Sequence, residues 1–128
     1  MDTTFLIDIM RARSRALDAL EVLDAEREPV AVTTVTLQEM ARGLATTDLT
    51  PARRTELLEL AAARTVLPLD RHSARRAGEV DAALWAAGTP LDPEDAAIAG
   101  IALSHDEVLL TRREDIFGRV DGLRLRVY

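Results

Sequence analysis

The stretch Glu94–Leu103, with the sequence EDAAIAGIAL, does most to define the fold of this chain. After its two acids come eight residues without a single polar side chain, so a helix formed here has no polar face. A helix that is apolar all round is buried on every side. The stretch therefore predicts a buried helix, and it places the carboxyl group of Asp95 at the start of that helix.

Apolar and β-branched runs on both sides of this helix predict short strands. One run follows the helix and two precede it. At the end of the chain, apolar residues alternate with arginines, as is typical of an edge strand. The predicted strands cover residues 30–34, 65–69, 107–111 and 123–128.

Capping residues mark the helices between these strands. Ser14 and Thr50 each stand where a helix begins, and Thr36 is predicted to cap another helix, in which Glu39 completes a capping box. Residues 70–87 form a further predicted helix. The alternation of strands and helices predicts an α/β fold with a mainly parallel central sheet flanked by helices.

Length and composition limit the number of domains and the kinds of site that the chain can have. Its 128 residues correspond to a single domain over residues 1–128, and 48% hydrophobic with 30% charged residues are typical of a globular protein. The absence of cysteine excludes disulfides, zinc–cysteine sites and cysteine nucleophiles. No apolar run is long enough to span a membrane and no signal-peptide pattern begins the sequence, so we expect a cytoplasmic protein.

The chain is acidic, with 22 acidic residues, 16 basic residues and a net charge of −6. All of the basic residues are arginines. An acidic protein binds nucleic acid poorly unless a local positive charge offsets its field. A bound metal ion together with arginines on one face would supply that charge.

Four acids lie where predicted strands give way to helices. Asp2 stands where a first strand would end, Asp95 opens the buried helix, and Glu39 and Asp115 each follow one of the predicted strands. In a parallel sheet these positions share one edge, where ligands bind. Carboxylates gathered there repel one another unless a cation neutralises them, and Mg²⁺ or Mn²⁺ suits oxygen ligands. The four acids are therefore the candidate metal-binding and catalytic residues.

Each acid also has a purely structural interpretation. Asp2, Glu39 and Asp95 lie near predicted helix starts, where a carboxylate stabilises a helix without any ligand. Asp95 is the least easily explained in this way, because it leads into a buried helix. Asp8 is interpreted either as a surface residue or as a residue that contacts a metal-binding side chain without binding the metal itself.

Four motifs in order along the chain resemble those of PIN-domain proteins, in particular VapC-type toxins. The opening DTTFLID at residues 2–8 resembles their D-T-[NST]-x-L-I-D motif, and EMARG at residues 39–43 resembles their E-[LM]-x-x-G helix. Residues 95–102, DAAIAGIA, resemble D-A-x-I-A-x-x-A. Residues 109–117, LLTRREDIF, resemble L-[VL]-T-R-[ND]-x-x-x-F.

The resemblance implies a PIN fold with an acidic Mg²⁺ or Mn²⁺ site. It also implies endoribonuclease activity and a VapB-type antitoxin that covers or occupies the site. Asp2, Glu39 and Asp95 match the acids of the family's motifs. By the same resemblance, Thr4 and Thr111 would orient carboxylates or water through hydrogen bonds.

Two features depart from the family's pattern. Only Met1 precedes the first acid, where the family has an apolar strand, and Arg113 stands where the family often has Asn or Asp. Asp115 is therefore taken as a substitute fourth acid, with Glu114 as the competing choice. Arg113 would instead contact RNA phosphate, which arginine binds with two parallel hydrogen bonds.

Two other classes of protein remain as alternatives. A PIN-like fold that has lost catalysis and serves as an assembly module would fit both departures. A flavodoxin-like regulator with a phosphoacceptor pocket is less favoured, because such sites usually need a lysine and this chain has none. For any of these classes we expect a homodimer, with Leu57, Leu58 and Leu60 as candidates for its contact face.

Overall fold

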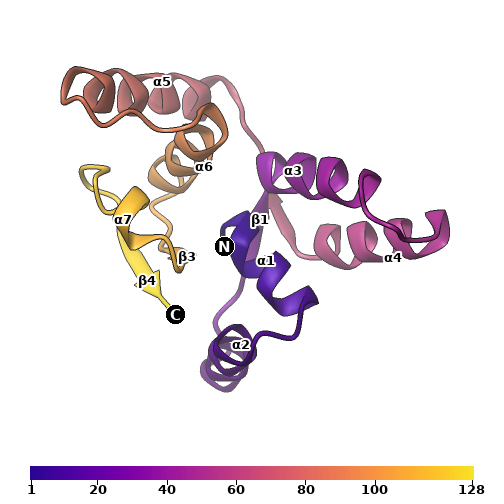
Figure 1. Cartoon of the computed structure of the whole chain (residues 1–128). Coiled ribbons are helices and arrows are strands. Elements are labelled where there is room, and N and C mark those ends of the chain that lie inside the picture. The colour runs from indigo at the N-terminus through magenta and orange to yellow at the C-terminus, as the bar shows by residue number, and fades with distance from the viewer.

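The computed structural model describes all 128 residues, in which short strands alternate with helices (Figure 1). This confirms the predicted α/β class. The elements in chain order are α1 (Thr3–Met10), α2 (Ser14–Glu26), β1 (Ala31–Thr33), α3 (Thr34–Ala45), α4 (Pro51–Ala62), β2 (Thr65–Leu67), α5 (Arg71–Ala86), α6 (Pro93–Ser104), β3 (Leu109–Thr111), α7 (Glu114–Phe117) and β4 (Leu125–Val127).

The strands form two parallel pairs. β1 pairs with β2, so that Val32 lies opposite Val66, and β3 pairs with β4, so that Leu110 lies opposite Arg126. The parallel direction is as predicted, whereas the sheet is divided between two separate halves rather than being one continuous central sheet. In Figure 1 the two halves lie on either side of the N-terminus.

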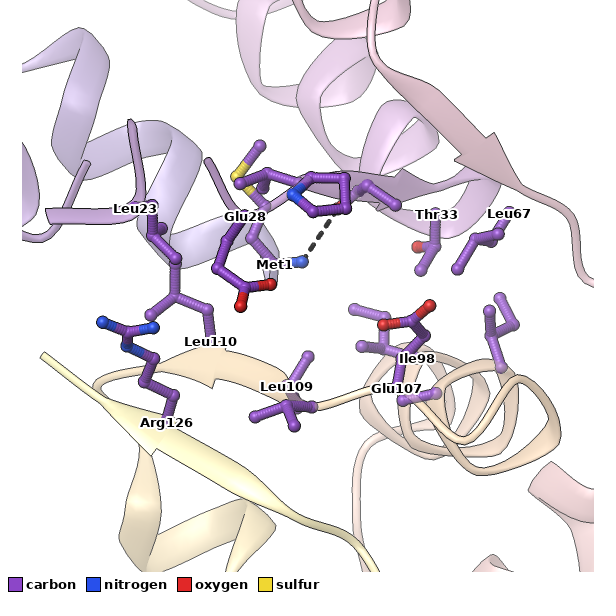
Figure 2. A pocket seen from close by; sticks show the side chains of 16 residues that line it. Met1, Leu23, Glu28, Thr33, Leu67, Ile98, Glu107, Leu109, Leu110 and Arg126 are labelled. Atoms are coloured by element: carbon purple, nitrogen blue, oxygen red, sulfur yellow. Dashed lines mark hydrogen bonds between the residues drawn. The ribbon is translucent and has the colours of Figure 1, made fainter. Parts of the chain in front are cut away.

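Met1 and Asp2 connect the two halves, and we call these two residues the N-terminal join. The amine of Met1 donates to the carbonyl of Ala31 in β1 at 2.9 Å. The backbone N–H of Asp2 donates to the carbonyl of Leu110 in β3 at 3.1 Å. Beside the join lies a cavity of about 270 Å³, lined mainly by apolar side chains from both halves (Figure 2). The first two residues thus connect the two strand pairs through backbone hydrogen bonds.

Two hydrophobic clusters fill the interior, and β3 contributes to both. Leu109 packs with the cluster around α5, α6 and α7, whereas Leu110 packs with the cluster around α1, α2 and β1. Successive side chains of a strand point to opposite faces, so one strand can serve two cores. This alternation holds β3 in the middle of the molecule.

Two helix starts place acids differently from the sequence-based expectation. The cap of α3 is Thr33, whose Oγ1 accepts from the backbone N–H of Thr36 at 2.9 Å. The predicted cap, Thr36, is therefore inside the helix, and Glu39 lies in its second turn rather than in a capping box. At α5 the capping box is formed instead by Asp70 and Ser73.

The helix α6 is buried on all sides, as predicted, and α5 packs directly against it. Gly100 makes this close packing possible, because a Cβ atom at this position would lie 2.6 Å from the backbone nitrogen of Ala77. The contact fixes α6, and with it Asp95 in the first turn. No helix of the chain has both the length and the apolar character needed to cross a bilayer.

Candidate active site

Asp2 is fully buried and is held by its own helix and by β3. As the cap of α1, it accepts from the backbone N–H of Phe5 through Oδ1 at 2.9 Å. Its other oxygen, Oδ2, accepts from the hydroxyl of Thr111 at 2.6 Å. Thr111 ends β3, so the first acid of the chain is fixed at the carboxyl end of a strand near the other terminus.

Asp95 faces the same point from the first turn of α6, and Arg113 bridges the two acids. Nη2 of Arg113 donates to Asp95 Oδ1 at 2.6 Å, and Nη1 donates to Oδ2 at 3.1 Å. Nε of the same guanidinium lies 3.4 Å from Oδ2 of Asp2. The Asp95 side chain is 7% exposed, so two buried carboxylates converge on one positive group.

The guanidinium of Arg113 is itself held firmly. It stacks over the ring of Phe117 at 4.9 Å, and its side chain is 27% exposed. Burial opposes its charge, but the hydrogen bonds and charge of Asp95, together with Asp2, outweigh burial and raise the pKa of Arg113. The three groups therefore form a charged cluster in which Arg113 is the cation that both acids contact.

Glu39 is linked by a hydroxyl group to the start of α1, one residue after Asp2. Oε1 of Glu39 accepts from the hydroxyl of Thr3 at 2.7 Å. The Thr3 hydroxyl also lies 3.5 Å from that of Thr36, which in turn accepts from Thr33 at 3.0 Å. The Glu39 side chain is 22% exposed, and Arg42 lies 4.0 Å from its Oε2. Glu39 is thus the most accessible of the three acids Asp2, Glu39 and Asp95.

Asp115 is exposed in the first turn of α7, with no hydrogen bond or ion pair to the other three acids. Glu114, the competing choice, is exposed beside it. The structure therefore brings Asp2 and Asp95 together on Arg113, links Glu39 to Thr3, and leaves Asp115 apart. The role of Asp115 stays a prediction.

Two polar residues near the site differ from the sequence-based interpretation. Asp8 is not at the surface: it is buried, accepts from the hydroxyl of Tyr128 at 2.9 Å and lies 3.3 Å from Nε of Arg112. Thr3 rather than Thr4 donates to a site carboxylate. The run Phe5–Met10 contains one acid among apolar residues, and that lone charge is the available signal that Asp8 needs a buried partner.

The donors of the site suit a hard divalent ion, although the present arrangement does not form a complete coordination site. No three His, Asp or Glu side chains are placed so that they could hold a metal ion together. The converging donors Asp2 and Asp95 are carboxylate oxygens, which Mg²⁺ and Mn²⁺ prefer. Asp2 and Asp95 carry two negative charges, and Arg113 neutralises only one of them. A divalent ion would neutralise both.

Comparison with known proteins shows which family the chain belongs to. The family model for the PIN domain matches residues 1–123. The chain belongs to the PIN-domain family. The PIN-like fold predicted from the motifs is therefore confirmed.

Similar curated proteins place this PIN domain beside VapC endonucleases. The tRNA(fMet)-specific endonuclease VapC of Shigella flexneri is 29% identical over 125 residues, which cover 94% of each chain. The tRNA(fMet)-specific endonuclease VapC of Salmonella typhimurium LT2 is 35% identical over 95 residues, covering 73% of this chain and 71% of the relative.

Solved structures similar to this PIN domain are toxin–antitoxin complexes. One is VapBC from Salmonella typhimurium bound to DNA, with a TM-score of 0.80 and 28% identity, covering 93% of this chain and 90% of that chain. Another is VapBC2 from Rickettsia felis bound to a promoter DNA fragment, with a TM-score of 0.85 and 20% identity, covering 99% and 96%. At the latter identity the likeness concerns the fold alone.

Proposed function

We propose that this chain is a divalent-metal-dependent endoribonuclease, the toxin of a VapBC-type pair, which hydrolyses RNA phosphodiester bonds in the cytoplasm. The observation that carries the proposal is the convergence of the buried carboxylates of Asp2 and Asp95, which lie far apart in the sequence, with Glu39 bonded to Thr3, the residue after Asp2. Membership of the PIN family and likeness to VapC endonucleases support the class of reaction.

Asp2 and Asp95 would hold the ion, Mg²⁺ or Mn²⁺, with Glu39 and Asp115 as further ligands or as holders of bound water. When bound, such an ion stabilises negative charge on the phosphoryl and leaving oxygens and makes bound water more acidic. It would also supply the local positive charge that this acidic chain lacks.

The chain's own side chains orient the reacting groups. Thr111 donates to Oδ2 of Asp2 and the backbone of Phe5 donates to Oδ1, so this carboxylate has one fixed orientation. Thr3 donates to Oε1 of Glu39, whose side chain is 22% exposed, and Arg42 lies 4.0 Å from Oε2. In this position Glu39 would orient the attacking water and accept its proton.

The proposed partners are RNA, a VapB-type antitoxin and a second copy of the chain. The VapBC complexes among the similar structures support an antitoxin as partner. Exposed apolar side chains such as Leu60 on α4 and Trp85 on α5 supply surface that protein contacts commonly cover. The names of the curated relatives make initiator tRNA the first RNA to assay.

The decisive test is RNA cleavage in Mn²⁺ by the wild type and by Asp95→Asn. Because the variant keeps the size of the side chain but loses a charged ligand, we expect cleavage to fall about 100-fold or more. Asp81→Asn makes the same change at an exposed position on α5 and should leave cleavage unchanged. Excess EDTA should abolish wild-type cleavage, and circular dichroism of both variants checks that they are folded.

Cleavage that persists in EDTA, or that Asp95→Asn leaves intact, would contradict the proposal. The second candidate, an assembly module without catalysis, is favoured by one observation: Arg113 lies between the two acids that a metal ion would bind. In that case no RNA should be cleaved under any metal condition, and the antitoxin-type partner should still bind.

A further inference from the structure

Arg113 uses its whole guanidinium on the two buried acids. Both terminal nitrogens donate to Asp95, at 2.6 and 3.1 Å, and Nε lies 3.4 Å from Asp2. Its backbone N–H donates to the hydroxyl of Thr111 at 3.0 Å, and this hydroxyl donates to Asp2. Main chain and side chain of one residue are therefore both tied to the pair of carboxylates.

No other cation shares this position. The neighbouring Arg112 pairs with Asp8, and Arg42 pairs with Glu39 and Glu94. Asp2 and Asp95 make their ion pairs with Arg113 alone. If Arg113 withdrew without a replacement, two buried carboxylates would be left facing each other, at a high cost in free energy.

A metal ion and Arg113 need the same oxygens. Arg113 engages both oxygens of Asp95, while Asp2 has Oδ1 bonded to Phe5 and Oδ2 shared between Thr111 and Arg113. The pair thus has no carboxylate oxygen free of a donor for a second cation. Two cations brought to the same oxygens would also repel each other.

We propose that Arg113 is an internal counter-ion that competes with the divalent metal: the ion binds the Asp2–Asp95 pair only when the guanidinium leaves it. Arg113 thereby stabilises the metal-free chain and sets the metal concentration at which the site fills. This inference rests on the proposed metal-dependent function, and it concerns a residue at which the chain departs from the family's motif.

Competition of this kind raises the apparent dissociation constant of the metal, which equals the intrinsic constant divided by the fraction of molecules in which the ion pair is open. If the ion pair is closed in about nine of ten molecules or more, removing the guanidinium should strengthen binding by about tenfold or more. The metal-free protein should at the same time lose stability, because the buried carboxylates lose their counter-charge. A residue that only packed against the site would not produce this opposite pair of effects.

The test measures Mn²⁺ affinity by isothermal titration calorimetry and the melting temperature with and without Mn²⁺. For Arg113→Gln we expect about tenfold tighter binding or more, a lower melting temperature without metal, and a larger rise on adding Mn²⁺. Arg112→Gln is the matched control, since it removes the same charge from the adjacent residue without touching Asp2 or Asp95. It should bind Mn²⁺ like the wild type.

A second variant covers the case in which Arg113→Gln does not fold. Arg113→Lys keeps the charge but replaces the planar fork by a single ammonium group, so its Mn²⁺ affinity should lie between those of the wild type and Arg113→Gln. If these variants bind Mn²⁺ no more tightly than the wild type and Arg112→Gln, or if no form binds it, the inference is overturned.

Cleavage assays separate this inference from the proposed function. Tighter Mn²⁺ binding by Arg113→Gln without RNA cleavage by any form would support the competition and contradict the nuclease. Metal-dependent cleavage by the wild type, with unchanged Mn²⁺ affinity in Arg113→Gln, would support the nuclease and contradict the competition.

Discussion

At the scale of single residues, the site depends on side chains whose partners come from distant parts of the chain. Tyr128, the last residue, donates to Asp8 in the first helix and packs edge-on against Phe5, with ring centroids 4.8 Å apart. Burial, followed by the hydrogen bond to Asp8 and the charge of Asp8, raises the pKa of Tyr128 above its usual 10.0. The end of the chain is thereby fastened to the helix that Asp2 begins.

This contact predicts a loss of stability in alkali. The folded chain retains the phenol proton above pH 10, where the unfolded chain loses it. The contribution of this contact to the free energy of unfolding should therefore be constant below pH 10 and fall as pH rises beyond 10. Tyr128 is the only tyrosine, and the chain has neither lysine nor cysteine to titrate in the same range. Urea unfolding from pH 8 to 12 measures the slope.

Tyr128→Phe is the control for this alkaline effect. It should be less stable than the wild type near neutral pH, because Asp8 loses a hydrogen bond, but it should lack the decline attributed to the phenol. A variant whose stability falls above pH 10 as steeply as that of the wild type would show that another group is responsible.

Single residues also mark the limit of what the sequence predicts. Positions at strand ends and family motifs are enough to single out Asp2, Glu39 and Asp95. The partner of each acid depends on side-chain directions that such patterns do not contain. Arg113 stands out in the sequence as a departure from the family, and its contact with RNA phosphate stays a prediction, but no pattern indicates that it bridges two acids.

At the scale of elements, the packing of α5 against α6 controls where Asp95 lies. The approach is so close that the position of Gly100 has no room for a side chain. A Cβ atom at Gly78, which is exposed on α5, would have no neighbour within 4 Å. Two glycines in neighbouring helices thus have opposite roles.

Gly100→Ala should destabilise the protein, because its Cβ would lie 2.6 Å from a backbone atom that cannot rotate away. We expect a loss of about 1–3 kcal/mol in the free energy of unfolding, typical of overpacking. Gly78→Ala should instead gain about 0.5–1 kcal/mol from helix propensity alone. Chemical denaturation of both variants checks the contrast, and a stable Gly100→Ala protein would mean that the helices separate easily.

The elements themselves are more predictable than their ends. The apolar run 96–103 and the cap at Thr50 mark helices that the structure contains. The predicted cap of α3 is wrong by three residues, because Thr33, Thr34 and Thr36 are all chemically suitable caps. Only the end of β1 decides among them, and a strand's end is set by its partner strand.

At the scale of the whole molecule, the fold and the site share one feature. The N-terminal join connects two half-sheets and also supplies Asp2. The sequence predicts parallel strands but not the division between them, because the pairing of β1 with β2 and of β3 with β4 is decided by tertiary packing. A change at the join should therefore affect stability and metal binding together.

The join also offers a way to measure how often the molecule opens at its centre. The backbone N–H of Asp2 is bonded to the carbonyl of Leu110, and Asp2 is fully buried, so this hydrogen exchanges with heavy water only when the contact with β3 opens. Exchange at Asp2, followed by NMR, should therefore be much slower in the native chain than in urea. Equal rates would mean that the two halves separate freely.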